Sequence, residues 1–153
     1  MSALYLLDPA AVASCDALSK SEVLAALADK FAQVYDLDAP LVLDALEGRE
    51  RLGSTGFGRG VAIPHARIPG IRRPICAVLR LGAPVSFDSA DGLPVDLAFG
   101  LLSPEHSGAT HLHALAAISR MMRDERLRDR LSEAHNDESV YALLTSVSGR
   151  DAA

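Results

Sequence analysis

The chain has 153 residues, of which 49% are hydrophobic and 23% are charged, and its formal net charge is −5. This length and composition predict one globular domain with a sizeable core and argue against a disordered chain. The acidic balance, with no run of basic residues, argues against sequence-independent binding of nucleic acid, which needs a dense cationic surface.

The N-terminal segment MSALYLLDPAA is a poor match to a secretory signal, because no basic region precedes its short apolar run. No window of the chain approaches the roughly 18 apolar residues of a membrane span. Two cysteines, Cys15 and Cys76, are too few for a disulfide framework. We therefore expect no membrane insertion and a reducing, cytoplasmic setting.

Two helices are predicted ahead of the middle of the chain. Apolar residues recur at helical spacing through residues 19–37, where Ser19 or Ser21 can cap the first turn. A second helix is predicted to start after Asp38 and to end at Gly53.

The middle of the chain is predicted to form strands. Short apolar segments stand between turn signals at 61–63, 75–81, 85–87 and 95–102. Because these segments are apolar almost throughout, they indicate a sheet that helices cover on both faces.

The last third is predicted to be helical. Residues 110–134 fit two helices or one broken helix, and residues 136–147 fit a final helix capped by Asp137. The fold class is therefore α/β (α+β): a single-domain sandwich with a central mixed sheet of four to five strands flanked by helices on both sides. One domain is expected over 1–153, with its core at about 5–147.

A glycine-rich loop leads into a proline–histidine pair in GSTGFGRGVAIPHAR, residues 53–67. Such glycines allow positive φ and close approach to a ligand, and unpaired amides in these loops bind anions such as phosphate. Pro64 has no N–H, so we expect sheet pairing to stop there and His65 to emerge at a strand end. A largely neutral imidazole at that place suits a phosphorylated histidine. The alternative is an ordinary surface or half-buried histidine at a strand end. The candidate phosphate-binding positions are Ser54, Thr55, Gly56, Gly58 and Gly60.

Two more candidates lie outside this loop. A helical wheel whose buried side is set by the apolar residues from Leu112 to Met122 places His111 at the edge of the core face and His113 in solvent. Arg49, sixteen residues before His65, is placed to lie under the glycine loop, with a solvated charge at a helix end as the alternative.

Residues 50–66 resemble the phosphorylation-site signature of enzyme IIA proteins of the fructose–mannitol–nitrogen class in bacterial phosphotransferase systems. Every position of that signature is met, by Glu50, Phe57, Gly58, Val61, Ala62, Ile63, Pro64, His65 and Ala66. The segments 87–105 and 110–131 are also similar to this family. Within it, LGSTGFGRGVAIPH and THLHAL resemble the nitrogen-regulatory branch more than the sugar-transport branch.

The resemblance implies that His65 accepts a phosphoryl group from an HPr-type phosphocarrier, on the ring nitrogen distal to the backbone. It also implies that Arg49 assists, that His111 is the second active-site histidine, and that the phosphorylation state controls regulatory protein targets. No metal and no organic cofactor are implied. One departure is PHAR in place of the usual PHG followed by Lys, so that Arg67 keeps the charge but changes its shape.

Two alternatives stay open. In the same fold, the chain could be a sugar-specific IIA component that passes its phosphate to a IIB partner. The other is a metal-binding protein that uses His65, His106, His111 and His113, although carboxylates or cysteines at ligand spacing are lacking.

Overall fold

The computed structural model describes residues 4–152, with side chains up to residue 146. A six-stranded mixed sheet forms the centre of this part of the molecule. Its strands follow the order β1-β5-β6-β3-β2, and β4 pairs with β6 as well. The strands are β1 (Leu6–Cys15), β2 (Gly56–Gly58), β3 (Val61–Ala62), β4 (His65–Ile68), β5 (Ile75–Val85) and β6 (Val95–Pro104). The helices are α1 (Lys20–Tyr35), α2 (Ala39–Arg51), α3 (Ala109–Met122), α4 (Glu125–Glu133) and α5 (Asp137–Ala152).

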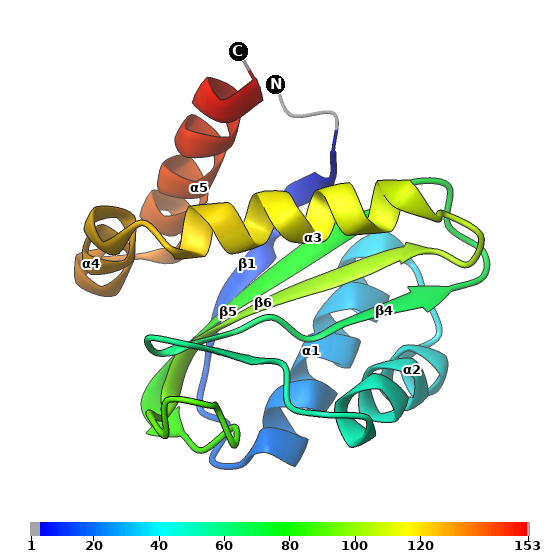
Figure 1. Cartoon of the computed structure of the whole chain (residues 1–153), viewed down its shortest axis with the longest axis horizontal. Coiled ribbons are helices and arrows are strands. Elements are labelled where there is room, and N and C mark those ends of the chain that lie inside the picture. The colour runs from blue at the N-terminus through cyan, green and yellow to red at the C-terminus, as the bar shows by residue number, and fades with distance from the viewer. Residues whose placement is uncertain (1–3, 153) are drawn as a thin grey trace.

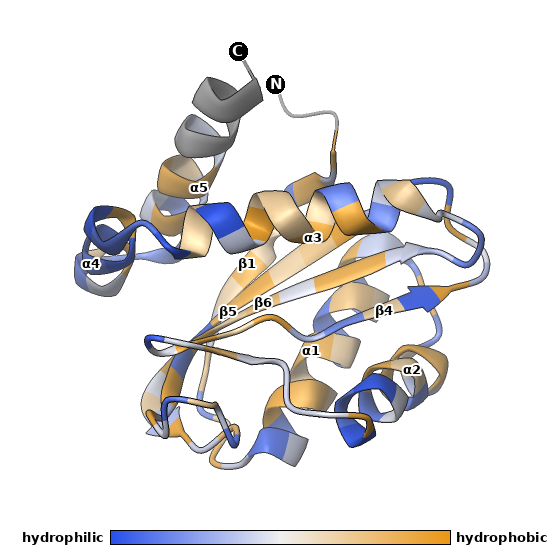
Figure 2. Ribbon diagram, in the orientation of Figure 1, coloured by the Kyte–Doolittle hydropathy of each residue, from blue (hydrophilic) through white to orange (hydrophobic). Residues whose placement is uncertain are grey.

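Helices cover both faces of this sheet, as the apolar strands predicted. Helices α1 and α2 lie on one side, α3 crosses the other, and α4 and α5 continue from α3 towards β1 (Figure 1). The apolar colouring of the strands and of the helix sides turned towards them marks the core (Figure 2), where Phe31, Phe87 and Phe99 are fully buried. The α/β sandwich is confirmed, with six strands against the four to five expected.

The helix ends follow local capping chemistry. Ser19 Oγ accepts from the backbone N–H of Glu22 at 3.1 Å and so starts α1 as predicted. Asp124 caps α4, which divides the long helical stretch into α3 and α4. The predicted cap of α5 is wrong by one residue, because Asn136 Oδ1 accepts from the N–H of Ser139 and Asp137 already lies in the helix.

Strand β1 was not predicted from the sequence. It runs parallel to β5 at the edge of the sheet, and its register shifts between Leu7 and Val12. Pro9 lies inside this irregular stretch, where an edge strand tolerates a residue without a ladder donor. Strand β5 ends at Val85, so the strand predicted at 85–87 is wrong beyond that residue.

Strands β3 and β4 behave as one interrupted strand beside β6. Val61 pairs with Leu97 and His65 with Leu101, so the register does not change between them. Pro64 has no donor, but its carbonyl accepts from the N–H of Leu101 at 2.9 Å. The expectation that pairing stops at Pro64 is therefore wrong: pairing resumes, and His65 begins a strand instead of following one.

Helix α3 is rotated relative to the predicted wheel. His111 is 4% exposed and Leu112 is 58% exposed, whereas the wheel used Leu112 to set the buried direction. His113 is exposed, as expected. The wheel weighed only hydrophobicity, and it could not register the hydrogen bond that makes burial of His111 favourable. Among the described residues, no helix combines the length and apolar character needed to cross a bilayer.

Candidate active site: a pair of histidines

His65 stands at the first position of β4 with its ring half-buried. Its Nδ1 lies 2.8 Å from the carbonyl oxygen of Ile63. A carbonyl oxygen can only accept, so Nδ1 must carry the hydrogen and donate it. In the neutral ring the lone pair is then on Nε2, which makes Nε2 the nucleophilic atom.

His111 comes from the first turn of α3 and is buried, with its Nδ1 2.7 Å from Ser103 Oγ. Ser103 lies near the end of β6, is fully buried, and has no other side-chain partner among the described residues. If Nδ1 donated, the serine hydroxyl hydrogen would be left unpaired in the interior, which is costly. We therefore assign Ser103 as the donor, so that His111 carries its own hydrogen on Nε2.

The two rings face each other closely, with centroids 5.6 Å apart and an interplanar angle of 44°. Burial lowers the pKa of His65, and the charge of Arg49 lowers it further, against the opposing effect of the bond to Ile63. Burial lowers the pKa of His111 to about 4, with smaller contributions from the charge of Arg67 and from His65 when that ring is protonated. Both rings are therefore neutral at pH 7, one offering a lone pair and the other an N–H donor.

Arg49 lies in the last turn of α2, and its charge acts on His65. Its Nη1 donates to the carbonyl oxygen of Gly53 at 2.8 Å, which ties the helix end to the glycine loop. The structure thus brings His65 and His111 into contact and places the charge of Arg49 close enough to act on His65. The remaining N–H groups of the guanidinium can serve an anion at the site.

The glycine loop is held by its own contacts. The amide of Thr55 donates to Glu50 Oε2 at 2.8 Å, the amide of Gly56 donates to Ser54 Oγ at 2.9 Å, and Ser54 Oγ donates to the carbonyl of Phe87. Because these two amides already have partners inside the protein, they are not free to bind a phosphate. Ser54 and Thr55 fix the shape of the loop beside the histidines.

A partly buried ion pair supports this loop. The Glu50 carboxylate is 6% exposed and lies 2.8 Å from Lys20 Nζ of α1. Its other oxygen accepts from Thr55 Oγ1 at 2.5 Å. The sequence marked Glu50 only as part of a signature. Lys20, thirty positions earlier, gave no signal, because only the packing of α1 against α2 brings the two together.

Glycine is required in this loop for two different reasons. A β-carbon on Gly56 would collide with Ser89 Oγ, so glycine at this position allows the Ser89 side chain to lie close to the backbone. Gly58 and Gly60 have φ of +101° and +86°, which side chains rarely adopt. Arg59 between them also has a positive φ, and its amide donates to Asp91 Oδ2 at 2.7 Å, which anchors the turn.

The remaining histidines do not join the pair. His106 and His113 are exposed, and His113 points away from the buried side of α3 that carries His111. Within the described residues, no group of three or more histidine, cysteine or acidic side chains is placed to hold a metal ion. The geometry therefore gives no support to the metal-binding alternative.

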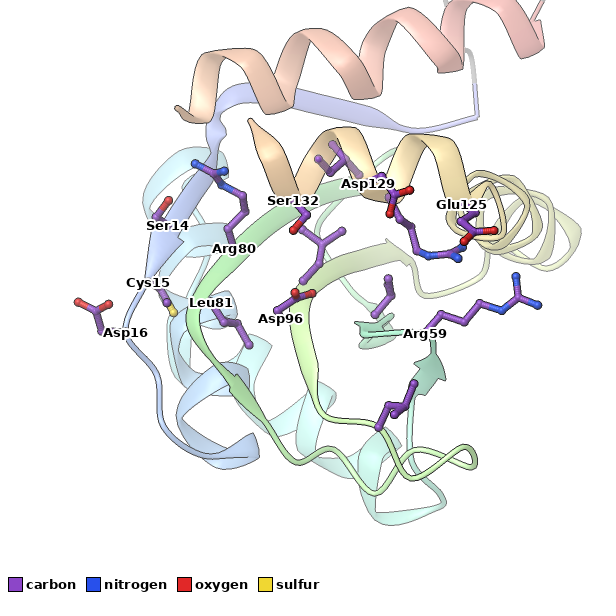
Figure 3. A pocket seen from close by; sticks show the side chains of 16 residues that line it. Ser14, Cys15, Asp16, Arg59, Arg80, Leu81, Asp96, Glu125, Asp129 and Ser132 are labelled. Atoms are coloured by element: carbon purple, nitrogen blue, oxygen red, sulfur yellow. The ribbon is translucent and has the colours of Figure 1, made fainter. Parts of the chain in front are cut away.

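A pocket of about 630 Å³ lies away from the histidines, towards the start of β6 (Figure 3). Asp96 and Arg80 from the sheet and Asp129 from α4 line it. His65 lies beside Leu101, further along the same strand. The pocket and the histidine pair thus adjoin different parts of β6.

A known family covers almost the whole chain. The family described as "Phosphoenolpyruvate-dependent sugar phosphotransferase system, EIIA 2" matches residues 6–147. The chain therefore belongs to this family of phosphotransferase-system IIA components, in agreement with the resemblance of its proline–histidine motif.

Individual relatives point to a branch within that family. The "Nitrogen regulatory protein" of Pseudomonas aeruginosa is 46% identical over 130 residues, which are 84% of each chain. The crystal structure of the nitrogen regulatory protein IIA-Ntr from Neisseria meningitidis superposes with a TM-score of 0.84 at 34% identity, covering 90% of this chain and 95% of that one. The "PTS system fructose-specific EIIA component" of Haloferax volcanii is 38% identical over 126 residues, covering 82% of this chain and 80% of that protein.

Proposed function

We propose that this protein accepts a phosphoryl group on Nε2 of His65 from an HPr-type carrier and acts as a nitrogen-type regulator. The observation that carries the proposal is the bond from His65 Nδ1–H to the carbonyl of Ile63, which leaves Nε2 with its lone pair beside the N–H of His111. The greater likeness to nitrogen regulatory proteins than to the fructose-specific component supports the regulatory role.

The transfer needs no external acid or base. Nε2 of His65 attacks the phosphorus held by a nitrogen of the carrier's histidine; the new N–P bond forms as the carrier's N–P bond breaks, and the carrier imidazole recovers its electron pair. The hydrogen on Nδ1 of His65 stays in place. Catalysis then consists of aligning the two nitrogens and stabilising the charge on the equatorial oxygens. Arg49 and the Nε2–H of His111 are the donors that we assign to those oxygens.

The modification changes the electrostatics of the surface. A phosphoryl group adds about −1.5 to −2 charges at one place, on a chain whose net charge is already −5. A target that binds near His65 will therefore distinguish the two forms by charge repulsion or by contact with the phosphoryl oxygens. The cytoplasmic location stays a prediction from the sequence.

The test is phosphorylation in a reconstituted relay of phosphoenolpyruvate, enzyme I and an HPr-type carrier. We expect the intact protein to gain the mass of one phosphate and His65→Ala to gain none. His113→Ala is the matched control, because this exposed histidine belongs to the same helix as His111, and it should be modified normally. An equal gain in the intact protein and in His65→Ala would reject the site.

The sugar-transport alternative has its own readout. The phosphorylated protein is mixed with a purified sugar-specific IIB component, and loss of its phosphate to IIB is followed over time. Rapid and complete transfer would favour the sugar branch. Retention of the phosphate would support the regulatory one.

A further inference from the structure

Arg67 lies on the same face of the sheet as both histidines. His65 and Arg67 are two positions apart on β4, so their side chains point to the same side. Arg67 pairs in register with Ser103 of β6, and Ser103 is the residue that holds His111. The strand pairing therefore places Arg67 beside the residues that carry the histidine pair.

Arg67 has no partner of its own within the described residues. Its side chain is exposed and makes neither a hydrogen bond nor an ion pair there. Arg49, in contrast, already donates to the carbonyl of Gly53. Burial is the main cause of the low pKa of His65 and of His111, and the charge of Arg67 contributes to lowering both.

We propose that Arg67 binds the phosphoryl group on His65 and so stabilises the phosphorylated form of the protein. The proposal rests on the function proposed above and adds a residue to that site. A guanidinium presents five N–H donors in a planar fork that fits two oxygens of a phosphate at once. The donors of Arg67 have no protein acceptor to leave when the phosphoryl group arrives.

The contact exists only after transfer, so its free energy favours the phosphorylated product over the starting state. The equilibrium between carrier and protein is therefore the quantity that Arg67 controls. Because Arg67 is exposed, water and salt compete for it, and we expect a moderate effect of about three- to tenfold. A lysine at this position keeps the charge but not the two-point contact.

The experiment compares the intact protein with Arg67→Ala, Arg67→Lys and the control Arg72→Ala. Arg72 is also exposed, and its charge is not among the causes of the lowered pKa of either histidine. Each protein is equilibrated with a fixed amount of phosphorylated carrier, and the fraction phosphorylated is read by 31P NMR. We expect the equilibrium constant to fall about three- to tenfold in Arg67→Ala and less in Arg67→Lys. Arg72→Ala should match the intact protein.

A second measurement tests the placement of Arg67 without phosphate. NMR titration of the two rings should show a higher pKa for both His65 and His111 in Arg67→Ala, because a nearby positive charge is removed. Equal behaviour of Arg67→Ala and Arg72→Ala in either measurement would overturn the role of Arg67. Absence of phosphate from the intact protein would instead reject the proposed function, and with it this inference.

Discussion

Ser103 Oγ, which we assign as the donor, lies 2.7 Å from Nδ1 of His111, and neither residue is more than 4% exposed. This single bond decides which ring nitrogen of His111 carries hydrogen, and the answer is the nitrogen not bonded to the serine. The second histidine is thereby kept as a hydrogen-bond donor without being charged. A neutral donor in this place can stabilise a phosphoryl oxygen while leaving the nearby nucleophile unprotonated.

Removing the serine hydroxyl should weaken phosphoryl transfer without abolishing it. In Ser103→Ala the ring of His111 can adopt either tautomer, so the donor is lost for part of the time. We expect transfer to slow about tenfold, less than the ~10²–10³ typical of losing such a donor completely. Rapid-quench measurement of transfer from the phosphorylated carrier gives the rate, and 15N NMR of the ring gives the tautomer. A slower rate with an unchanged tautomer would contradict the explanation.

The donor role of His111 can be separated from its bulk. The amide N–H₂ of glutamine can take the place of Nε2–H, so His111→Gln should transfer phosphate at a rate within about tenfold of the intact protein. His111→Ala should lose about 10²-fold. The same rapid-quench assay compares them. Equal losses in both variants would mean that the ring acts through something other than its N–H.

The phosphorylated atom of His65 should be Nε2. Nδ1 holds the hydrogen donated to Ile63, and a phosphoryl group on Nδ1 would have to replace that hydrogen and face a carbonyl oxygen. The 15N–31P couplings of the labelled phosphoprotein distinguish the two ring positions. Detection of the phosphate on Nδ1 would show that the bond to Ile63 breaks during transfer.

The free energy of unfolding should fall as the pH is lowered, because over part of the pH range His111 is neutral in the folded protein but protonated in the unfolded chain. Its pKa is about 4 in the folded protein, against the usual 6.5 of a histidine in an unfolded chain. Between these values the unfolded chain binds a proton that the folded protein does not, so acid favours unfolding. From pH 7 to pH 5 this residue should cost about 2 kcal/mol of unfolding free energy. Urea denaturation at both pH values measures the loss, and His111→Gln, which cannot titrate, should lose less by that amount.

The ion pair beneath the glycine loop should contribute to stability. Glu50→Ala removes both acceptors of Thr55 and leaves Lys20 without its nearest partner. Because Lys20 is partly exposed, we expect about 2–3 kcal/mol of lost unfolding free energy, below the cost of breaking a fully buried pair. Urea denaturation tests this against Glu47→Ala, a change of the same charge on the same helix. Glu47 has no hydrogen bond or ion pair within the described residues. Similar losses in the two variants would contradict the assigned role.

The sequence predicted those parts of the fold that depend on local patterns. Apolar spacing and a capping serine define α1, and an almost continuous apolar run defines β6. Strand β1 was missed because Pro9 falls inside an irregular edge pairing, which only the neighbouring strand makes possible. The rotation of α3 was also missed, since burial of His111 depends on a partner from another element.

The candidate site divides in the same way. The proline–histidine motif identified His65, while Arg49 and His111 came from their spacing and from the family resemblance. The sequence indicated Ser103 only weakly, as a polar residue after the apolar run of β6. No sequence pattern indicated Lys20, because only the packing of distant segments brings it to Glu50.

The constant register of β3 and β4 against β6 makes the chain between Ala62 and His65 a fixed spacer. Side chains alternate along a strand, so lengthening or shortening this spacer by one residue would turn the imidazole towards α1 and α2, away from its partner on α3. A surface loop elsewhere in the chain would tolerate such an insertion. At this position it would separate the two rings while leaving the sheet intact. The two-residue length of this spacer, Ile63 and Pro64, is thus as important to the reactive centre as the two rings.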